Sequence, residues 1–182
     1  YNGFKGDIAD YVWRLKEYNE DEFSNRVIAS VTNNWQIIKG LKLRTRLSTD
    51  FTSMRTESRQ STTVPLAFGY SGYFGLSSYN NTILYGDALL SYTKSINKDF
   101  DVSVMAGYTA NTDKTTSLSR GTNGGLSIEN YFDLNASVNT QNSGSSRINL
   151  VKDAIIGTAN VSYKNYLFAE ATVRRDRTST MN

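Results

Sequence analysis

The sequence contains no Cys, no His and a single Pro among its 182 residues. Without Cys the chain forms neither a disulfide scaffold nor a thiolate nucleophile, and without His it lacks the usual catalytic triads and most metal-binding sets. The net charge of +3 is too small to indicate a nucleic acid as a partner. No apolar run approaches the roughly 20 residues of a membrane-spanning helix. We therefore expect no catalytic residues, no metal site and no cofactor.

Small polar residues and aromatic residues are abundant instead. The chain has 21 Ser, 19 Thr and 18 Asn, and 12 Tyr, 8 Phe and 2 Trp. This polar, aromatic-rich composition favours strands and argues against a helical bundle. Two all-β classes remain open, which are a soluble β-domain and a membrane β-barrel whose apolar positions are diluted by alternation.

A first hairpin is predicted by alternation on both sides of a short turn. In residues 41–51 the odd positions are apolar or Thr, and the even positions are charged or Ser. Residues 26–36 alternate in a similar way. Ile38-Lys39-Gly40 is expected to form a three-residue turn, with Gly40 at the position that needs a positive φ. Pairing residue 37 with residue 41 then sets Trp35 against Leu43 on one face.

Two further hairpins follow the same construction. Residues 84–94 and 100–110 flank the turn at Asn97-Lys98-Asp99, in a register that places Leu89 opposite Gly107. Residues 155–163 pair with residues 167–173 across Lys164-Asn165-Tyr166. The expected strands are 24–36, 41–53, 83–96, 100–111, 154–163 and 167–176. The expected extracellular loops are 1–22, 54–82 and 112–152, with a short helix around Ala9 to Tyr18.

Three features favour a membrane barrel over a soluble sandwich, which would also alternate. The turns are short at one end of all three hairpins and long at the other. Each strand has about ten alternating residues, enough to cross the apolar band when tilted. The apolar face has aromatic residues near its ends, such as Trp35 and Tyr108, as in an interfacial girdle. The opposite face would line a water-filled lumen with Arg26, Arg44, Arg46, Asp50, Asp87, Asp101, Glu170 and Arg174.

The number of strands indicates a section of a larger barrel. An antiparallel sheet in lipid cannot leave an edge unpaired, because each unsatisfied backbone group there costs several kcal/mol. The smallest single-chain barrels have about eight strands, which is more than the six predicted in this sequence. Several copies could also assemble into one barrel, but loops this long suit a wide barrel better. We therefore expect the chain to be a segment of a wider barrel.

Candidate binding residues lie in the expected loops. Aromatic side chains there could stack on sugar rings or pack on a partner, although loop aromatics also anchor their own loop. Asp87 and Asp101 lie roughly 26 Å apart in the predicted register, which excludes a catalytic carboxylate pair. Arg174 and Asp176 could pair with each other or with another domain, and we expect a structural role. The candidate ligand-binding aromatics are Tyr70, Tyr73, Phe74, Tyr79, Tyr131 and Phe132.

The motifs resemble those of SusC/RagA-type TonB-dependent outer-membrane transporters. The run NRVIASVTNNWQIIKGLKLRTRLSTDF is similar to their strand, Lys-Gly-Leu turn and returning strand. The run ANVSYKNYLFAEATVRRDRTSTM is similar to a hairpin followed by Arg-Arg-Asp-Gly-Ser-Ser, with Arg177 where Gly is usual and Asn165 where Asp is frequent. The matching positions are Asn160, Ser162, Tyr163, Lys164, Tyr166, Arg174, Arg175, Asp176, Thr178 and Ser179.

This resemblance implies a barrel of about 22 strands around an N-terminal plug. Such transporters reside in the outer membrane of Bacteroidota, import oligosaccharides or peptides, draw energy through TonB and are capped by a SusD-like lipoprotein. The plug domain and a TonB box are absent from this sequence, so we expect a barrel segment. Its implied partners are the rest of the barrel and the plug, the lipoprotein, TonB through the plug, membrane lipid and a glycan or peptide. The alternative is a soluble, surface-exposed β-domain that binds carbohydrate or protein.

Overall fold

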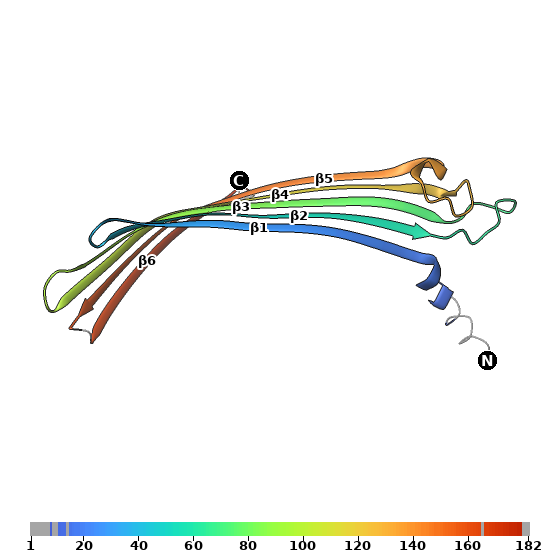
Figure 1. Cartoon of the computed structure of the whole chain (residues 1–182). Helices are drawn as coiled ribbons and strands as arrows, with labels where there is room; N and C mark the ends of the chain where they lie inside the picture. Colours follow the sequence, from blue (N-terminus) through green and yellow to red (C-terminus); the bar gives the residue numbers. More distant parts are fainter. Residues whose placement is uncertain (1–7, 9–10, 14, 165, 180–182) are drawn as a thin grey trace. The chain divides into compact units, whose positions relative to one another are not determined.

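Six strands form one open antiparallel sheet in which each strand lies beside its neighbour in the chain (Figure 1). The computed structural model describes residues 8, 11–13, 15–164 and 166–179. The expected all-β antiparallel architecture is confirmed, and β1 and β6 are the outer strands of the sheet. The strands are β1 (Tyr18–Ile38), β2 (Leu41–Gln60), β3 (Tyr73–Ser95), β4 (Phe100–Leu126), β5 (Ser137–Tyr163) and β6 (Leu167–Thr178).

The chain divides into two compact units, each built from parts of several strands. Unit 1 comprises Tyr1–Asn25, Thr52–Asn80 and Thr115–Arg147. Unit 2 comprises Arg26–Phe51, Asn81–Lys114 and Ile148–Asn182. The division follows composition, because unit 2 holds the alternating apolar segments and the short turns, whereas unit 1 holds the polar strand ends and the longer connections.

Two of the predicted registers in unit 2 are confirmed. In the β5–β6 pair, Tyr163 lies opposite Leu167 and Ala159 opposite Ala171, as the alternation requires. In the β3–β4 pair, the hydroxyl groups of Thr93 and Ser103 lie 3.1 Å apart. A Cβ added at Gly107 would lie 2.1 Å from Leu89 Cδ2, so the Leu89 side chain occupies the space above this glycine.

The first turn differs slightly from the expectation. Strand β1 continues through Ile38, so Lys39 and Gly40 alone separate it from β2. Gly40 has the expected positive φ, +86°, and a Cβ there would lie 2.5 Å from the carbonyl oxygen of Thr93. Glycine is therefore required twice, by the backbone conformation and by the neighbouring strand. The register of the β1–β2 pair remains a prediction.

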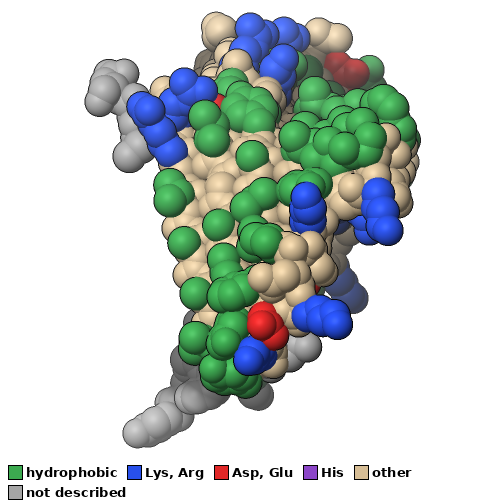
Figure 2. All heavy atoms as spheres, turned by 90° about the vertical axis from the view of Figure 1, so that its left-hand side faces the viewer, with side chains coloured by type: hydrophobic (Ala, Val, Ile, Leu, Met, Phe, Trp, Pro, Cys, Tyr) green, Lys and Arg blue, Asp and Glu red, His purple; other side chains and the backbone are tan. Residues whose placement is uncertain are grey.

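Large apolar side chains of unit 2 stand open on the sheet. Val31 and Val173 are each 73% exposed and Leu47 is 59% exposed. In Figure 2 hydrophobic side chains lie scattered on the surface among polar and backbone atoms. Trp35 and Tyr108, expected at the ends of the apolar face, are exposed as well. Within the described residues, no second protein layer covers this face.

The strands extend well beyond the expected boundaries, which is a correction to the proposed loops. Residues 54–60, 73–82, 112–126 and 137–152 are strand, so the described connections are 61–72 and 127–136. The sequence does not indicate these extensions, because the segments are rich in small polar residues and their few apolar residues do not alternate with period two. Their Ser, Thr and Tyr residues still suit a hydrogen-bonded ladder whose two faces are hydrated.

Unit 1 contains a small hydrophobic core at its connections. Phe74, Leu126 and Ala136 are buried, and Leu76, Phe132 and Leu134 pack against them. The 3-10 helix Leu134–Ala136 begins after Asp133, whose side chain accepts a hydrogen bond from the Asn135 amide. The two connections are joined by hydrogen bonds from the amides of Thr62 and Leu66 to Asn130 and Glu129. These connections are therefore folded against each other.

The expected N-terminal helix is seen in part. Residues Ile8, 11–13 and 15–17 are helical, Tyr18 already belongs to β1, and Ala9 lies outside the described residues. None of the helices in the described part of the chain is long and apolar enough to cross a membrane.

Candidate functional site

The polar face of unit 2 carries an ion-pair cluster across β2 and β3. Arg46 donates from Nε to Asp87 over 2.7 Å, and Arg44 Nη2 lies 3.4 Å from the other carboxylate oxygen. Arg46 also donates to the Tyr85 hydroxyl over 3.2 Å, and its guanidinium carbon lies 4.9 Å from the centre of that ring. The Asp87 side chain is 1% exposed, whereas both arginine side chains are more than 40% exposed.

Other predicted lumen residues form separate pairs. Arg26 binds Asp50 with two hydrogen bonds, of 2.9 and 2.6 Å, in a bidentate arrangement. Arg174 pairs with Asp176 over 2.8 Å, which is one of the two arrangements expected for it. Asp101 and Glu170 line a shallow groove of about 480 Å³ on β4 and β6.

These ion pairs give the face a hydrogen-bonded character, although Arg44 and Arg46 share one carboxylate, so their cluster has a net charge of one positive unit. Arg26, Arg44 and Arg46 each have a carboxylate partner, so none of them is a free anion receptor. Paired charges with exposed arginine heads suit a hydrated wall that is polar without holding an ion tightly. That this wall is a barrel lumen remains a prediction.

The six candidate aromatic residues of unit 1 have different environments. Phe74 is only 6% exposed and belongs to the core, so its assignment as a ligand contact is wrong. Phe132 packs against the same core. Tyr79 is half-buried on β3. Tyr70 and Tyr131 are 56% and 51% exposed and remain the candidates that a ligand could reach.

The Tyr73 side chain lies directly over two glycine residues, Gly75 and Gly121. A Cβ added at Gly75 or Gly121 would lie 2.6 or 2.4 Å from the Tyr73 hydroxyl oxygen. A Cβ at Gly144 would lie 2.9 Å from the Ser119 hydroxyl oxygen. The odd-numbered residues of β3 and β4 and the even-numbered residues of β5 therefore share one face of this part of the sheet.

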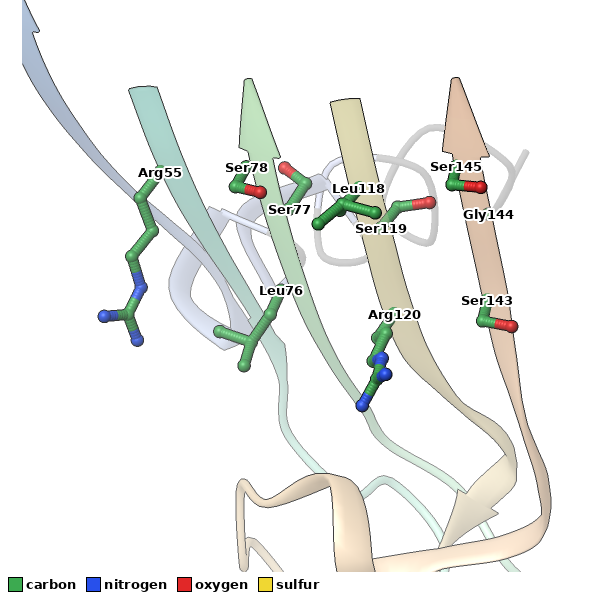
Figure 3. Close-up of a pocket in the computed structure, with 10 residues that line it drawn as sticks. All are labelled: Arg55, Leu76, Ser77, Ser78, Leu118, Ser119, Arg120, Ser143, Gly144 and Ser145. Atoms are coloured by element: carbon green, nitrogen blue, oxygen red, sulfur yellow. The ribbon is translucent and has the colours of Figure 1, made fainter. Parts of the chain in front are cut away.

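The opposite face of unit 1 carries a groove of about 510 Å³. Leu76 from β3 and Leu118 from β4 form its apolar part. Arg55 on β2 and Arg120 on β4 lie on either side of Leu76, and Ser143 and Ser145 of β5 complete the far wall (Figure 3). None of the lining residues that the structure describes is acidic.

The two arginine residues of this groove differ in their partners. Arg55 Nη2 lies 3.7 Å from Glu57, and Glu57 also binds Arg59, which in turn reaches Asp21 over 3.3 Å. The hydrogen bonds that Arg59 donates to the Glu57 carboxylate raise the pKa of Arg59 above its usual value. Arg120 is exposed and forms no ion pair with any residue that the structure describes. Most of the donors of both groove arginines therefore face solvent.

Sequence reasoning missed this groove because its residues lie in segments expected to be loops. The spacing of the residues is the signal that could have indicated it, because residues two apart on a strand point to the same face. The pairs with this spacing are Leu76 and Ser78, Leu118 and Arg120, and Ser143 and Ser145. The pairing of Arg177 with Asp153, on residues opposite each other in β5 and β6, was also missed. These two residues lie one position beyond the expected strands 154–163 and 167–176, and the predicted register, extended by one residue, places them opposite each other.

Solved structures of a peptide transporter are similar to this chain. The structure of the RagAB peptide transporter matches 91% of it with a TM-score of 0.81 at 16% sequence identity. The RagAB peptide importer in its 'closed-closed' state matches 90% of this chain with a TM-score of 0.75 at 17% sequence identity. The same importer in its 'open-open' state matches 91% of this chain with a TM-score of 0.75 at 16% sequence identity. This chain spans only 18–19% of the matched chains. No family model and no curated protein matches the sequence.

The resemblance drawn from the sequence motifs is confirmed at the level of the fold, because the open antiparallel sheet of this chain superposes on part of the chains in these transporter structures.

Proposed function

We propose that this chain is a barrel section of a SusC/RagA-type TonB-dependent transporter that imports nutrients across a bacterial outer membrane. Its chemistry is binding and passage of a substrate, with no covalent step. Because the similar structures are peptide transporters, a peptide is the first substrate class to test and an oligosaccharide the second.

The main observation that supports the proposal is the contrast between the two faces of the sheet in unit 2. Exposed aliphatic side chains such as Val31, Leu47 and Val173 occupy one set of alternating positions. Paired charges such as Arg46 and Asp87 occupy the other. Exposed aliphatic surface of this extent is unfavourable in water and favourable against lipid, whereas paired charges suit a hydrated interior.

The open edges of the sheet support a section of a larger barrel. Strand β1 has 21 residues and β6 has 12, and each pairs on one side only. The unpaired backbone N–H and C=O groups of an edge strand can form hydrogen bonds with a further strand. Within a bilayer these groups need such partners, because no water is there to bind them. We propose that the remaining barrel strands supply these partners and that the plug fills the enclosed space.

The proposed partners follow from the same assignment. A SusD-like surface lipoprotein would cap the extracellular side, TonB would act through the plug, and outer-membrane lipid would surround the apolar face. The exposed rings of Tyr70 and Tyr131 are the residues of unit 1 that we propose for contact with a substrate or with the lipoprotein.

Uptake by cells that carry the full-length protein tests the proposal. Labelled oligopeptides and oligosaccharides are supplied to wild-type cells, to cells with the gene deleted and to cells without TonB. We expect uptake of one substrate class that is lost in both mutants. A protein that purifies without detergent as a monodisperse soluble monomer, or uptake that does not depend on the gene, would refute the proposal.

A further inference from the structure

The three short turns of unit 2 lie together at one end of the sheet (Figure 1). The β1–β2 turn is joined to β3 by a hydrogen bond of 2.9 Å from the Thr93 amide to the Gly40 carbonyl oxygen. The β5–β6 turn is joined to the β3–β4 turn by a hydrogen bond of 2.7 Å from the Lys164 amide to the Asp99 carbonyl oxygen. The turns therefore form one continuous edge, which carries the lysine residues Lys39, Lys94, Lys98 and Lys164.

The positive charge of this turn edge is largely left unpaired by the protein. All four lysine side chains are exposed, and none of them pairs with a carboxylate among the described residues. Asp99 is the only acidic residue in the sequence of the three turns. Asp101 follows it, but on β4 it has the parity of the polar face. The turn edge therefore offers ammonium donors to an anionic ligand.

An aromatic cluster lies beside these lysine residues. The ring centres of Phe100 and Tyr163 are 4.7 Å apart, and those of Tyr163 and Tyr166 are 5.6 Å apart. The ammonium nitrogen of Lys164 lies 5.4 Å from the centre of the Tyr163 ring, and 70% of Tyr166 is exposed. Aromatic rings and lysine side chains with an apolar stem favour the boundary between hydrocarbon and lipid headgroups.

The apolar face of unit 2 begins directly at this cluster. Because successive side chains alternate between the two faces, every second residue beyond Phe100 and Tyr163 shares their face. The next two such residues on each strand are apolar, and they are Val102 and Val104 on β4 and Val161 and Ala159 on β5. An acyl chain on this face therefore reaches the rings and the lysine residues without crossing a polar side chain.

Resting on the proposed function, we propose that the turn edge binds an anionic glycerophospholipid of the periplasmic leaflet of the outer membrane. The short turns of a bacterial barrel face the periplasm. The lipid phosphate would accept hydrogen bonds from the ammonium groups of Lys98 and Lys164, and the acyl chains would lie against the aromatic cluster and the valine residues. A zwitterionic phospholipid should bind more weakly, because its own ammonium group offsets the charge of its phosphate.

Native mass spectrometry of the full-length transporter in neutral detergent tests this binding. The probes are phosphatidylglycerol, phosphatidylethanolamine with the same acyl chains, and soluble glycerol phosphate. Lys98→Gln combined with Lys164→Gln removes two charges of the turn edge, and Lys98→Arg combined with Lys164→Arg keeps them. Lys42→Gln combined with Lys152→Gln is the matched control, because it removes two exposed charges whose parity places them on the opposite face.

We expect the wild type to bind phosphatidylglycerol at least about fivefold more tightly than phosphatidylethanolamine. The double Gln variant of the turn edge should bind phosphatidylglycerol about tenfold more weakly, whereas the control should change by less than about twofold and the double Arg variant should keep the preference. Equal affinity of the wild type for both lipids, equal losses in the turn-edge variant and the control, or displacement of phosphatidylglycerol by glycerol phosphate would overturn the inference.

Nutrient uptake by cells that carry the same variants separates this inference from the proposed function. Uptake by the wild type together with equal binding of the two lipids refutes the lipid site alone. Lysine-dependent binding of phosphatidylglycerol to a protein that imports nothing supports the site and refutes the transport function.

Discussion

Arg46 and Asp87 form an ion pair in which the carboxylate is buried and the guanidinium is not. The Arg46 Nε donates to Asp87 over 2.7 Å, and the Asp87 side chain is 1% exposed. Arg44 and Arg46 cover it from the neighbouring strand while keeping their own heads in solvent. Substituting the carboxylate and substituting the arginines should therefore change the free energy of unfolding by different amounts, because only the carboxylate is desolvated.

Removing both arginines is expected to cost more than removing the carboxylate. Arg44→Met combined with Arg46→Met keeps the aliphatic cover over the carboxylate but removes both guanidinium partners, so it leaves a buried unpaired charge and should lower the free energy of unfolding by about 1–3 kcal/mol. Asp87→Asn leaves two arginine side chains that water can solvate and should cost less than about 1 kcal/mol. Urea unfolding of the detergent-solubilised transporter measures both, and a larger loss for Asp87→Asn would contradict this account.

Gly107 is expected to resist substitution because Leu89 fills the space above it. A Cβ at residue 107 would lie 2.1 Å from Leu89 Cδ2 and 3.3 Å from the Ala88 carbonyl oxygen. Gly107→Ala should therefore lower the free energy of unfolding by about 1 kcal/mol, and Leu89→Ala in the same chain should recover part of this loss. Strictly additive effects of the two substitutions, measured by the same unfolding experiment, would show that the residues do not meet.

Gly121 has a similar role beneath Tyr73. A Cβ there would lie 2.4 Å from the Tyr73 hydroxyl oxygen, so Gly121→Ala should displace the ring and speed hydrogen exchange of nearby β3 and β4 amides. Gly86→Ala is the matched control, because its Cβ would meet nothing closer than 3.8 Å. The prediction fails if both variants exchange at the wild-type rate, or if the control is perturbed equally.

The connections of unit 1 are expected to depend on Phe74 and not on Tyr70. Phe74→Ala removes a large side chain from a small core and should open residues 61–72 and 127–136 to protease on intact cells. Tyr70→Ala removes an exposed ring and should leave the cleavage rate within about twofold of wild type. Limited proteolysis followed by mass spectrometry gives the comparison, and equal protection of the two variants would argue against the core.

The sequence predicted unit 2 well because one physical signal dominates there. A face that must be apolar fixes both the period and the register, since a slip of one residue would reverse every side chain. The pairing of Tyr163 with Leu167 and the meeting of Leu89 with Gly107 follow from this rule alone. The positive φ of Gly40 follows from turn geometry in the same direct way.

Unit 1 could not be predicted in the same way because its strands have few apolar residues and no regular alternation. Residues 112–126 contain Ser, Thr, Gly and Asn without a period, so their strand character depends on hydrogen bonds to neighbouring strands. The burial of Phe74 depends on Leu126 and Ala136, which are more than 50 residues away in sequence. Likewise, the positions of Arg44, Arg46 and Asp87 in the sequence do not show that their side chains meet across β2 and β3.

The orientation of the two faces is the central claim, and labelling of paired neighbouring positions tests it most directly. The section contains no Cys, so each introduced cysteine gives one labelled site within it. Leu47→Cys, Val104→Cys and Ala171→Cys are compared with Ser48→Cys, Ser103→Cys and Thr172→Cys in the full-length protein in lipid bilayers. Spin labels at the first three positions should be relaxed mainly by oxygen, and those at the second three mainly by a water-soluble nickel chelate. The reverse pattern would place the apolar side chains in water or protein and contradict the account.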